Sequence, residues 1–197
     1  AKAISIVNKV LSIDVIESIY NSGIQVDLQI KDDVQLFSNL RLNGTEKIAL
    51  IISRGIDTPD ETFKFLLSVI NIDTFSDVNE GMKSYKLRCA YDYTIVNQSK
   101  TISDDFTDIS KKIEAIAKND LEIPEKLLDI SQSSQSAKGI IPRMKPLAAI
   151  NWLTRNIADG GTPYYFYQTS SGMVHLKSYK EMLNDIHEKD EVYSNNA

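Results

Sequence analysis

Three side chains could supply a soft metal ligand or a reactive thiol or imidazole. They are Cys89, His175 and His187. The histidines are twelve positions apart, and neither stands at a zinc-ligand spacing from Cys89 or from the other. The sequence therefore predicts no metal site and no cofactor, with both histidines in ordinary strand or surface positions.

Carboxylates give a second kind of candidate site. Asp104, Asp105 and Asp108 carry the oxygen ligands that calcium prefers, but the group lacks the central glycine and terminal glutamate of an EF-hand. Acidic residues are also favoured at the start of a helix, and we interpret the group in that way. Carboxylates distant in the chain can still meet and cleave a glycosidic bond, so a cell-wall hydrolase stays an alternative.

A third kind of candidate site would be a phosphate-binding loop or a catalytic nucleophile. The sequence contains no Gly-rich phosphate loop and no Gly-x-Ser-x-Gly elbow, and the glycines at 55 and 160–161 read as isolated turns. We therefore predict that the chain is not an enzyme. Asn43-Gly-Thr and Asn97-Gln-Ser match glycosylation sequons, but we interpret both as turns.

An aromatic run, Tyr164-Tyr-Phe-Tyr, has the composition of a platform on which bases or sugars stack. No basic residue is interleaved, which favours half-buried packing on a strand. A carbohydrate- or host-surface-binding module that uses Tyr164, Tyr165 and Tyr167 remains a second alternative, to be judged by the exposure of these rings.

Charge and composition limit the classes of partner. The net charge is −5 and neither half of the chain is basic, which argues against sequence-specific binding of nucleic acid. A mildly acidic surface can still line a passage for DNA, because like charge repels the phosphates. No apolar stretch approaches the ~20 residues of a membrane span, so we expect no membrane insertion. The single cysteine suits a reducing cytosol.

The elements that must carry these residues change character near residue 100. The first half shows period-2 alternation typical of strands, and Asn43-Gly44 is a strong hairpin signal. The predicted strands cover residues 4–10, 24–30, 37–42, 47–53, 63–70 and 85–93. We expect an antiparallel sandwich or barrel, and residues 14–20 could form either a helix or a strand.

The second half shows helical spacing. Ser103 is a candidate cap for a helix over 104–118, on which Phe106, Ile109, Ile113 and Ile116 form an apolar stripe. A second helix over 146–158 begins at Pro146. An aromatic hairpin over 162–176, turning at Ser171-Gly172, and a last helix from about residue 178 complete the pattern.

These patterns predict an α+β protein, in which an antiparallel β-rich portion precedes a small αβ domain. We place the β-rich portion at residues 1–97, the αβ domain at 98–190 and a polar tail at 191–197.

The order of three segments carries a resemblance to a known family. They are 139–153 (Gly-Ile-Ile-Pro-Arg-Met-Lys-Pro-Leu-Ala-Ala-Ile-Asn-Trp-Leu), 164–167 and 171–179 (Ser-Gly-Met-Val-His-Leu-Lys-Ser-Tyr). In this order they resemble the central hub protein of phage tail baseplates, and residues 43–48 and 84–89 fall where its barrel strands belong. The resemblance covers roughly residues 4–185. It implies that the β-rich portion is a tube-like partial barrel and that the αβ part is an inserted domain. The hydrolase alternative would then be a baseplate-associated cell-wall hydrolase. Such hubs continue past the inserted domain, so we expect the N-terminal portion of a hub, or a shortened relative.

The resemblance implies a structural component of the virion, located in the tail baseplate and assembled in the host cytoplasm. Its implied partners are copies of itself, as a trimer in the full-length form, together with tail tube, spike and other baseplate proteins. The ring would join the tube to the spike and let DNA pass. A related injection machine is the rival within the same class.

The candidate interface or structural residues all lie in the second half. Pro142 and Pro146 would stiffen the approach to the helix, Arg143 and Lys145 would be exposed for charged contacts, and aromatic side chains would pack the helix and hairpin. The complete set is Pro142, Arg143, Lys145, Pro146, Trp152, Tyr165 and Tyr167.

Overall fold

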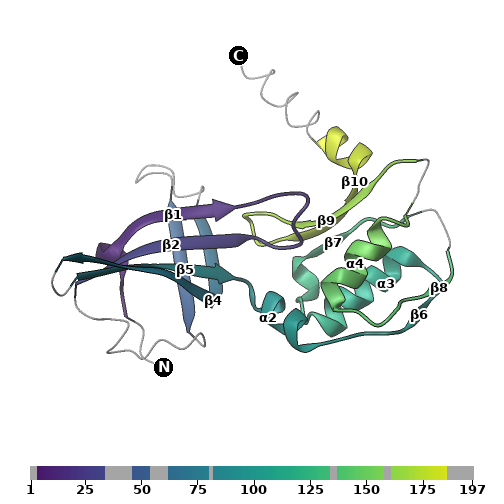
Figure 1. Cartoon of the computed structure of the whole chain (residues 1–197). Coiled ribbons are helices and arrows are strands. Elements are labelled where there is room, and N and C mark those ends of the chain that lie inside the picture. The colour runs from purple at the N-terminus through teal and green to yellow at the C-terminus, as the bar shows by residue number, and fades with distance from the viewer. Residues whose placement is uncertain are drawn as a thin grey trace, which may run out of the picture. The chain divides into compact units, whose positions relative to one another are not determined.

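The computed structural model of the chain describes residues 4–33, 46–53, 62–79, 82–133, 137–157 and 161–185, without the side chains of 74–79 and 82 (Figure 1). The chain divides into two compact units. One unit comprises residues 1–17 and 23–92, and the other comprises 18–22 and 93–197.

A five-stranded antiparallel sheet makes up most of the first unit. Its strand order is β1-β2-β5-β4-β3, so β1 and β3 are the two edges. The strands are β1 (Val10–Ile16), β2 (Gln25–Asp32), β3 (Lys47–Ser53), β4 (Thr62–Asn79) and β5 (Met82–Ala90), and a short 3-10 turn, Val7–Lys9, precedes them. The predicted antiparallel β-rich portion is confirmed.

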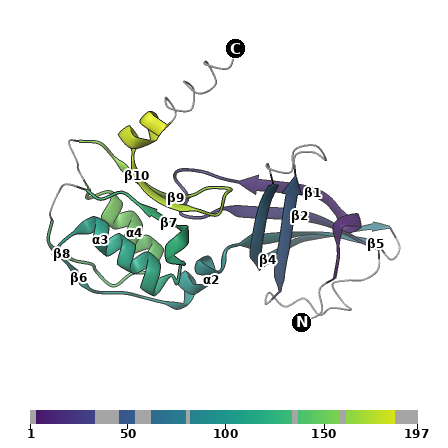
Figure 2. The same cartoon turned by 180° about the vertical axis from the view of Figure 1, so that it is seen from behind.

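The sheet curls because β4 bends. The first part of this 18-residue strand pairs with β3, and its later part pairs with β5. Its pairing with β5 shifts register between Val69 and Asn71 and again between Asp73 and Ser76. Such bulges bend a strand and increase its twist. The first part of β4 consequently turns away from β2 and β5 (Figure 1, Figure 2), and the sheet forms a partial barrel, as predicted.

Alternating apolar side chains fill the inner face of this curl. Val26, Leu28 and Ile30 of β2 point inward at every second position, while Gln25 and Gln29 point outward. Ile24, just before β2, belongs to the same buried cluster. The rest of the cluster comes from β4 and β5, and it consists of Phe65, Leu67, Val69, Tyr85, Leu87 and Cys89.

Three predicted strands of this half have other bounds in the structure. The strand expected over 63–70 continues to Asn79, the one expected over 85–93 spans Met82–Ala90, and the first strand is displaced. Residues 4–10 were expected to be a strand, but the strand starts only at Val10 and continues to Ile16. The pairing of Ile13 with Leu28 and of Val15 with Val26 decides this, because it aligns apolar side chains on the inner face. The undecided stretch 14–20 is therefore a strand at its start. The Asn43-Gly44 turn and residues 37–42 lie outside the described residues.

The second unit is a mixed αβ structure. Its main sheet has the order β7-β10-β9, with β10 parallel to β7 and antiparallel to β9, and a smaller sheet pairs β6 with β8. Residues 179–185 are helical as well. The bounds are α2 (Asp92–Ser99), β6 (Asp105–Phe106), α3 (Ile109–Ala115), a π turn (Ile116–Asp120), a 3-10 turn (Glu125–Leu127), β7 (Leu128–Ile130), β8 (Gly139–Ile140), α4 (Pro146–Thr154), β9 (Tyr164–Gln168) and β10 (Val174–Ser178).

The helix predicted over 104–118 begins later than expected. Asp108 is its cap, because its carboxylate accepts a hydrogen bond from the Lys111 N–H at 3.1 Å. The expected cap, Ser103, donates instead to the carbonyl of Ile141. Asp105 and Phe106 form β6 rather than the first turn. The stripe Ile109, Ile113 and Ile116 is buried, as predicted.

The later elements match the prediction more closely. Pro146 opens α4, which ends at Thr154. The aromatic hairpin forms, and Gly172 in its turn has φ of +87°, a conformation that favours glycine. The last helix starts after Ser178, whose hydroxyl accepts from the Glu181 N–H while Glu181 accepts from the Ser178 N–H. Helix α2 was not predicted, and it contains Asn97, which we expected in a turn.

The burial of Cys89 gives a testable consequence. Its side chain is 0% exposed, and burial, assisted by the nearby charge of Asp27, raises the pKa of the thiol to about 12. Because the thiolate is the reactive form, we expect Cys89 in the folded protein to resist a disulfide-exchange reagent at pH 8. The thiol should react at once in denaturant. Rapid labelling of the native protein would contradict this placement.

Candidate functional site

The segment before α4 is held by a side chain from another helix. Pro142, Arg143 and Lys145 are exposed, whereas Pro146 is buried at the start of the helix. Lys145 contacts the side-chain oxygen of Gln98. Asn97, only 7% exposed, accepts a hydrogen bond from the N–H of Leu147 at 2.8 Å. Helix α2 therefore caps α4, which supplies no side-chain cap of its own.

Trp152 supports this segment through one contact. Its ring meets Phe106 edge-on, with 6.2 Å between the ring centroids and 78° between the planes. Phe106 in turn covers Gly139 of the paired strand β8. A Cβ at Gly139 would lie 2.8 Å from the ring carbon Cζ of Phe106, closer than packed atoms come. Glycine is thus required at the start of the segment that carries the resemblance.

We therefore expect Gly139→Ala to destabilise the protein by about 1–3 kcal/mol, because the buried Phe106 ring must move against Trp152. Urea unfolding followed by circular dichroism measures the change. Ile140→Ala is the matched control, since Ile140 is 72% exposed and its truncation should cost less than about 0.5 kcal/mol. Equal stability of the two variants would show that Phe106 does not constrain position 139.

The aromatic hairpin divides its tyrosines between two faces. Tyr164 is buried, while Tyr165 and Tyr167 are half-buried on the opposite face. The ring of Tyr167 stacks on His175 with 5.2 Å between centroids, and Tyr165 meets Tyr20 edge-on. A sugar platform needs open ring faces. One face of Tyr167 is already covered, and Tyr164 is unavailable, so the hypothesis of a platform built from all three tyrosines is wrong.

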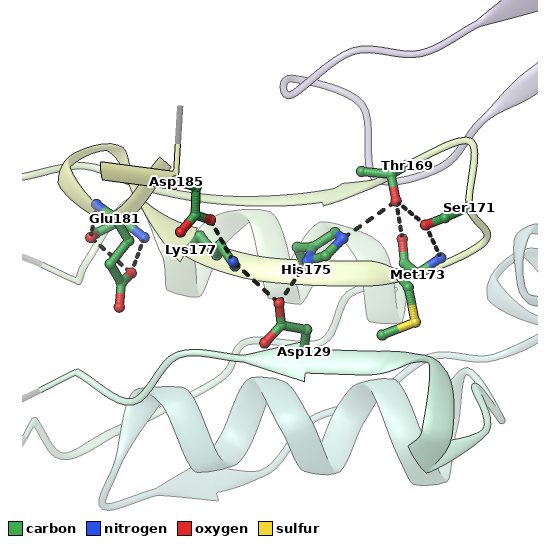
Figure 3. Close-up of polar contacts among 9 residues, drawn as sticks. Asp129, Thr169, Ser171, Met173, His175, Lys177, Glu181 and Asp185 are labelled. Atoms are coloured by element: carbon green, nitrogen blue, oxygen red, sulfur yellow. Dashed lines mark hydrogen bonds and ion pairs between the residues drawn. The ribbon is translucent and has the colours of Figure 1, made fainter. Parts of the chain in front are cut away.

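A polar network lies on this outer face of the main sheet (Figure 3). His175 Nδ1 is 2.9 Å from a carboxylate oxygen of Asp129, and the same oxygen lies 3.3 Å from Lys177 Nζ. Lys177 also pairs with Asp185 of the last helix at 2.8 Å. One carboxylate on β7 is therefore joined to β10 and, through Lys177, to the helix that follows it.

The network continues into the hairpin turn. Thr169 Oγ1 is 3.3 Å from His175 Nε2 and 2.8 Å from Ser171 Oγ (Figure 3). The order hydroxyl, imidazole, carboxylate is that of a serine-hydrolase relay. Here the hydroxyl is engaged in its own turn by Ser171 and by the Met173 carbonyl, and Asp129 is shared with Lys177. The arrangement holds the parallel pair β7·β10 and the hairpin together, and we interpret it as structural.

The Asp129 carboxylate gives a pH-dependent prediction. Partial burial raises its pKa, but hydrogen bonds and charge from His175 and Lys177 outweigh this and leave the pKa below its usual value. The ionised Asp129 carboxylate therefore stabilises the folded protein at pH values above the unfolded pKa of about 3.9. This stabilisation is lost as the pH falls through the lower pKa that Asp129 has in the folded protein.

We expect Asp129→Asn to be less stable at pH 6 by up to about 1 kcal/mol, because the carboxylate is partly exposed. This difference should shrink between pH 4 and 2.5. Urea unfolding of both proteins across that range measures it, and the other carboxylates cancel in the comparison. A difference that stays constant with pH would contradict the role of the charge.

The first unit exposes apolar side chains at both edges of its sheet. On β1, Leu11, Ile13 and Val15 are 56%, 40% and 37% exposed, although Ile13 and Val15 face the inner side. On β3, Ile51 is 67% exposed, and Leu66 of β4, which pairs with Ala49, is 61% exposed. Uncovered strand edges with such side chains are sites at which further strands pair.

Other kinds of site have no support in the described part of the chain. No group of three or more metal-binding side chains occurs among these residues. None of the described helices is long and apolar enough to span a bilayer. His187 lies outside the described residues.

Solved structures of other proteins have a similar fold. No family model and no curated protein sequence matches the chain. The structure aligns with the E. coli c3393 protein at a TM-score of 0.53 and 9% identity, over 85% of this chain and 48% of the other. That protein is described as a component of the type VI secretion system, with structural similarity to the T4 bacteriophage tail proteins gp27 and gp5.

The fold of this chain is similar to that of c3393. The predicted resemblance to a baseplate hub, with a partial barrel followed by an αβ unit, is thus confirmed as a resemblance of fold. The 43 kDa tail protein of prophage MuSo2 from Shewanella oneidensis also aligns, with a TM-score of 0.45 and 11% identity over 84% of this chain and 50% of its own. The chain spans about half the length of these proteins.

Proposed function

We propose that the chain is a structural building block of a phage tail baseplate hub or of the equivalent part of a related injection machine. In this role it forms part of a ring that joins a tail tube to a central spike and through which DNA passes. It acts through its surfaces and not through catalysis. Its place is the tail baseplate of the virion, reached by assembly in the host cytoplasm.

The observation that carries the proposal is the curled sheet of the first unit, in which β1 and β3 are the outermost of the described strands. A curled sheet closes only when its edge strands find partners, because each edge leaves a row of backbone N–H and C=O groups without protein hydrogen bonds. Pairing between neighbouring subunits would provide those bonds and cover the exposed Leu11, Ile13 and Ile51. The fold shared with c3393 supports the same role.

Electrostatics agrees with a passage for DNA. The chain has a net charge of −5, and the acidic excess would keep a polyanion from adhering to the wall. The same excess gives no support for a sequence-specific nucleic-acid contact, which needs a cationic surface.

In this proposal the second unit contacts other baseplate proteins. Arg143 and Lys145 are exposed beside the buried start of α4, where charged contacts with a partner can form. Pro142, Pro146 and Trp152 hold that segment in shape, and Tyr165 and Tyr167 stiffen the hairpin beside it. The contribution of each exposed charge to affinity would be modest, at about 0–1 kcal/mol.

The test is co-expression with the tube and spike proteins encoded beside the gene. We expect the full-length product to co-purify with at least one of them and to form rings with threefold symmetry under negative-stain electron microscopy. Arg143→Ala with Lys145→Ala should weaken capture of an outer baseplate protein and leave the ring intact. A full-length product that remains monomeric and captures none of these proteins would contradict the proposal.

A further inference from the structure

The cations of the second unit fall into two groups. Many of them pair with a carboxylate, and these are Lys100, Lys111, Lys112, Lys118 and Lys177. By contrast, Lys138, Arg143 and Lys145 are exposed and make no ion pair with any described residue. Lys126, Arg155 and Lys180 are also unpaired within the described ranges, but they are scattered along the chain. The short segment 138–145 therefore collects unneutralised positive charge in a chain whose net charge is −5.

An exposed aliphatic side chain stands among these cations. Ile140 is 72% exposed, whereas its neighbour Ile141 is fully buried. A single exposed isoleucine is ordinary on a protein surface. Here, however, unpaired cations precede and follow it in the chain, at Lys138 and Arg143. This combination suits a partner that brings an apolar group with carboxylates around it, because interface cores are apolar and their rims are polar.

The backbone of Ile140 adds directed hydrogen-bonding groups. The Ile141 N–H donates to the Asp104 carbonyl at 2.7 Å, and the register of β6 and β8 continues to this pair. Bonded and non-bonded pairs alternate along an antiparallel ladder, so Ile140 and Asp105 form a non-bonded pair. The N–H and C=O of Ile140 therefore point away from β6, and no described residue bonds to them. An extended partner segment alongside Ile140 can bond to both.

One carboxylate lies close to this surface. Asp105 is exposed and faces Ile140 across the two strands, in the kind of pair that brings side chains nearest. Within the described ranges it makes no ion pair, whereas the adjacent Asp104 is paired with Lys112. The three unpaired cations of segment 138–145 outnumber this single carboxylate. The surface consequently has a positive excess, which complements an acidic partner.

We propose that segment 138–145 is the docking surface for an acidic stretch of another baseplate protein. The stretch lies extended beside β8, places an apolar side chain against Ile140 and directs carboxylates to Lys138 and Arg143. This inference rests on the proposed function and names the chemistry of the partner at the surface which that function assigns to baseplate contacts. An acidic peptide uses the cations, the isoleucine and the backbone groups together, whereas a nucleic acid would use only the cations.

The first experiment searches for the acidic stretch directly. Overlapping peptides that cover the proteins encoded beside the gene are immobilised and probed with the fluorescently tagged 197-residue chain. We expect the bound peptides to share acidic residues around a large aliphatic or aromatic side chain. Fluorescence anisotropy of the tightest peptide in solution gives its affinity, which should fall as salt is added because the charges are exposed. Bound peptides without acidic residues, or no bound peptide at all, would overturn the proposal.

Two variants of the chain test the surface itself. Ile140→Ala removes the apolar contact, and Lys138→Glu combined with Arg143→Glu reverses the flanking charges. Each should weaken binding of the tightest peptide by about tenfold or more. All three side chains are exposed, so the fold should persist, and urea unfolding of each variant checks it. If both variants bind the peptide as tightly as the unchanged chain, the surface is not the docking site.

Two further variants are matched controls for charge. Lys180→Glu reverses an exposed, unpaired cation on the helix after β10, and this helix lies well away from β8 (Figure 1, Figure 2). Its affinity should stay within about twofold of the unchanged chain. Asp105→Asn removes the carboxylate beside Ile140 and should strengthen binding by about two- to fivefold. Equal losses from Lys180→Glu and from the double reversal would show that only net charge matters, which contradicts the proposal.

A polyanion supplies the competing explanation, and double-stranded DNA of random sequence tests it. We expect fluorescein-labelled DNA to bind much more weakly than the tightest peptide. If DNA binds as tightly, and Ile140→Ala leaves that binding unchanged, the segment is a phosphate-binding surface and the proposal is wrong.

The outcome can be told apart from that of the proposed function. If no peptide binds, but the full-length product still forms rings and captures a tube or spike protein, the inference fails and the proposed function stands. If peptide binding depends on Ile140 and on the flanking cations, while the full-length product stays monomeric and captures neither tube nor spike protein, the docking surface stands and the hub role fails.

Discussion

Backbone hydrogen bonding at the sheet edges is the constraint on which the first unit depends. Inside the sheet the backbone N–H and C=O groups of each strand bond to the neighbouring strands. The bulges of β4 curl the sheet, so that the apolar side chains of its inner face pack together. Among the described strands, the ladder stops at β1 and β3. Because β3 is aliphatic on both faces, the solubility of the unit and its core packing both depend on what covers that edge.

The second unit is held together differently. Its elements are short and come from distant parts of the sequence, so long runs of strand pairing cannot join them. Asn97 caps a helix that begins some fifty residues later, and Asp129 joins a three-residue strand to β10 and, through Lys177, to the last helix. Ring packing between Phe106 and Trp152 fixes the start of the segment before α4. In the second unit, polar side chains join the separate elements, as backbone pairing between strands does in the first unit.

Much of the fold could be predicted because its periodicities are strong. Strands β2 and β3, the first half of β4, most of β5, the stripe Ile109–Ile113–Ile116, helix α4 and the hairpin turn at Gly172 all follow from residue spacing and turn chemistry. The start of α3 was misplaced because Ser103 was expected to cap the helix. The pairing of β6 with β8 takes Asp105 and Phe106 into a strand, and Asp108 becomes the cap. The Asp129–His175 contact could not be predicted, since it depends on a parallel pairing between residues 46 positions apart. Strand order, and hence which strands are edges, is likewise not encoded in local pattern.

The number of strands in the curled sheet has a directional consequence. Neighbouring strands alternate in direction, and with five strands the two outermost, β1 and β3, run the same way. Copies that join through these edges without being turned over must therefore all point in one direction, with a parallel junction between them. A ring built in this way has two chemically different ends. Such polarity is what a part needs if it is to receive one structure above and a different one below.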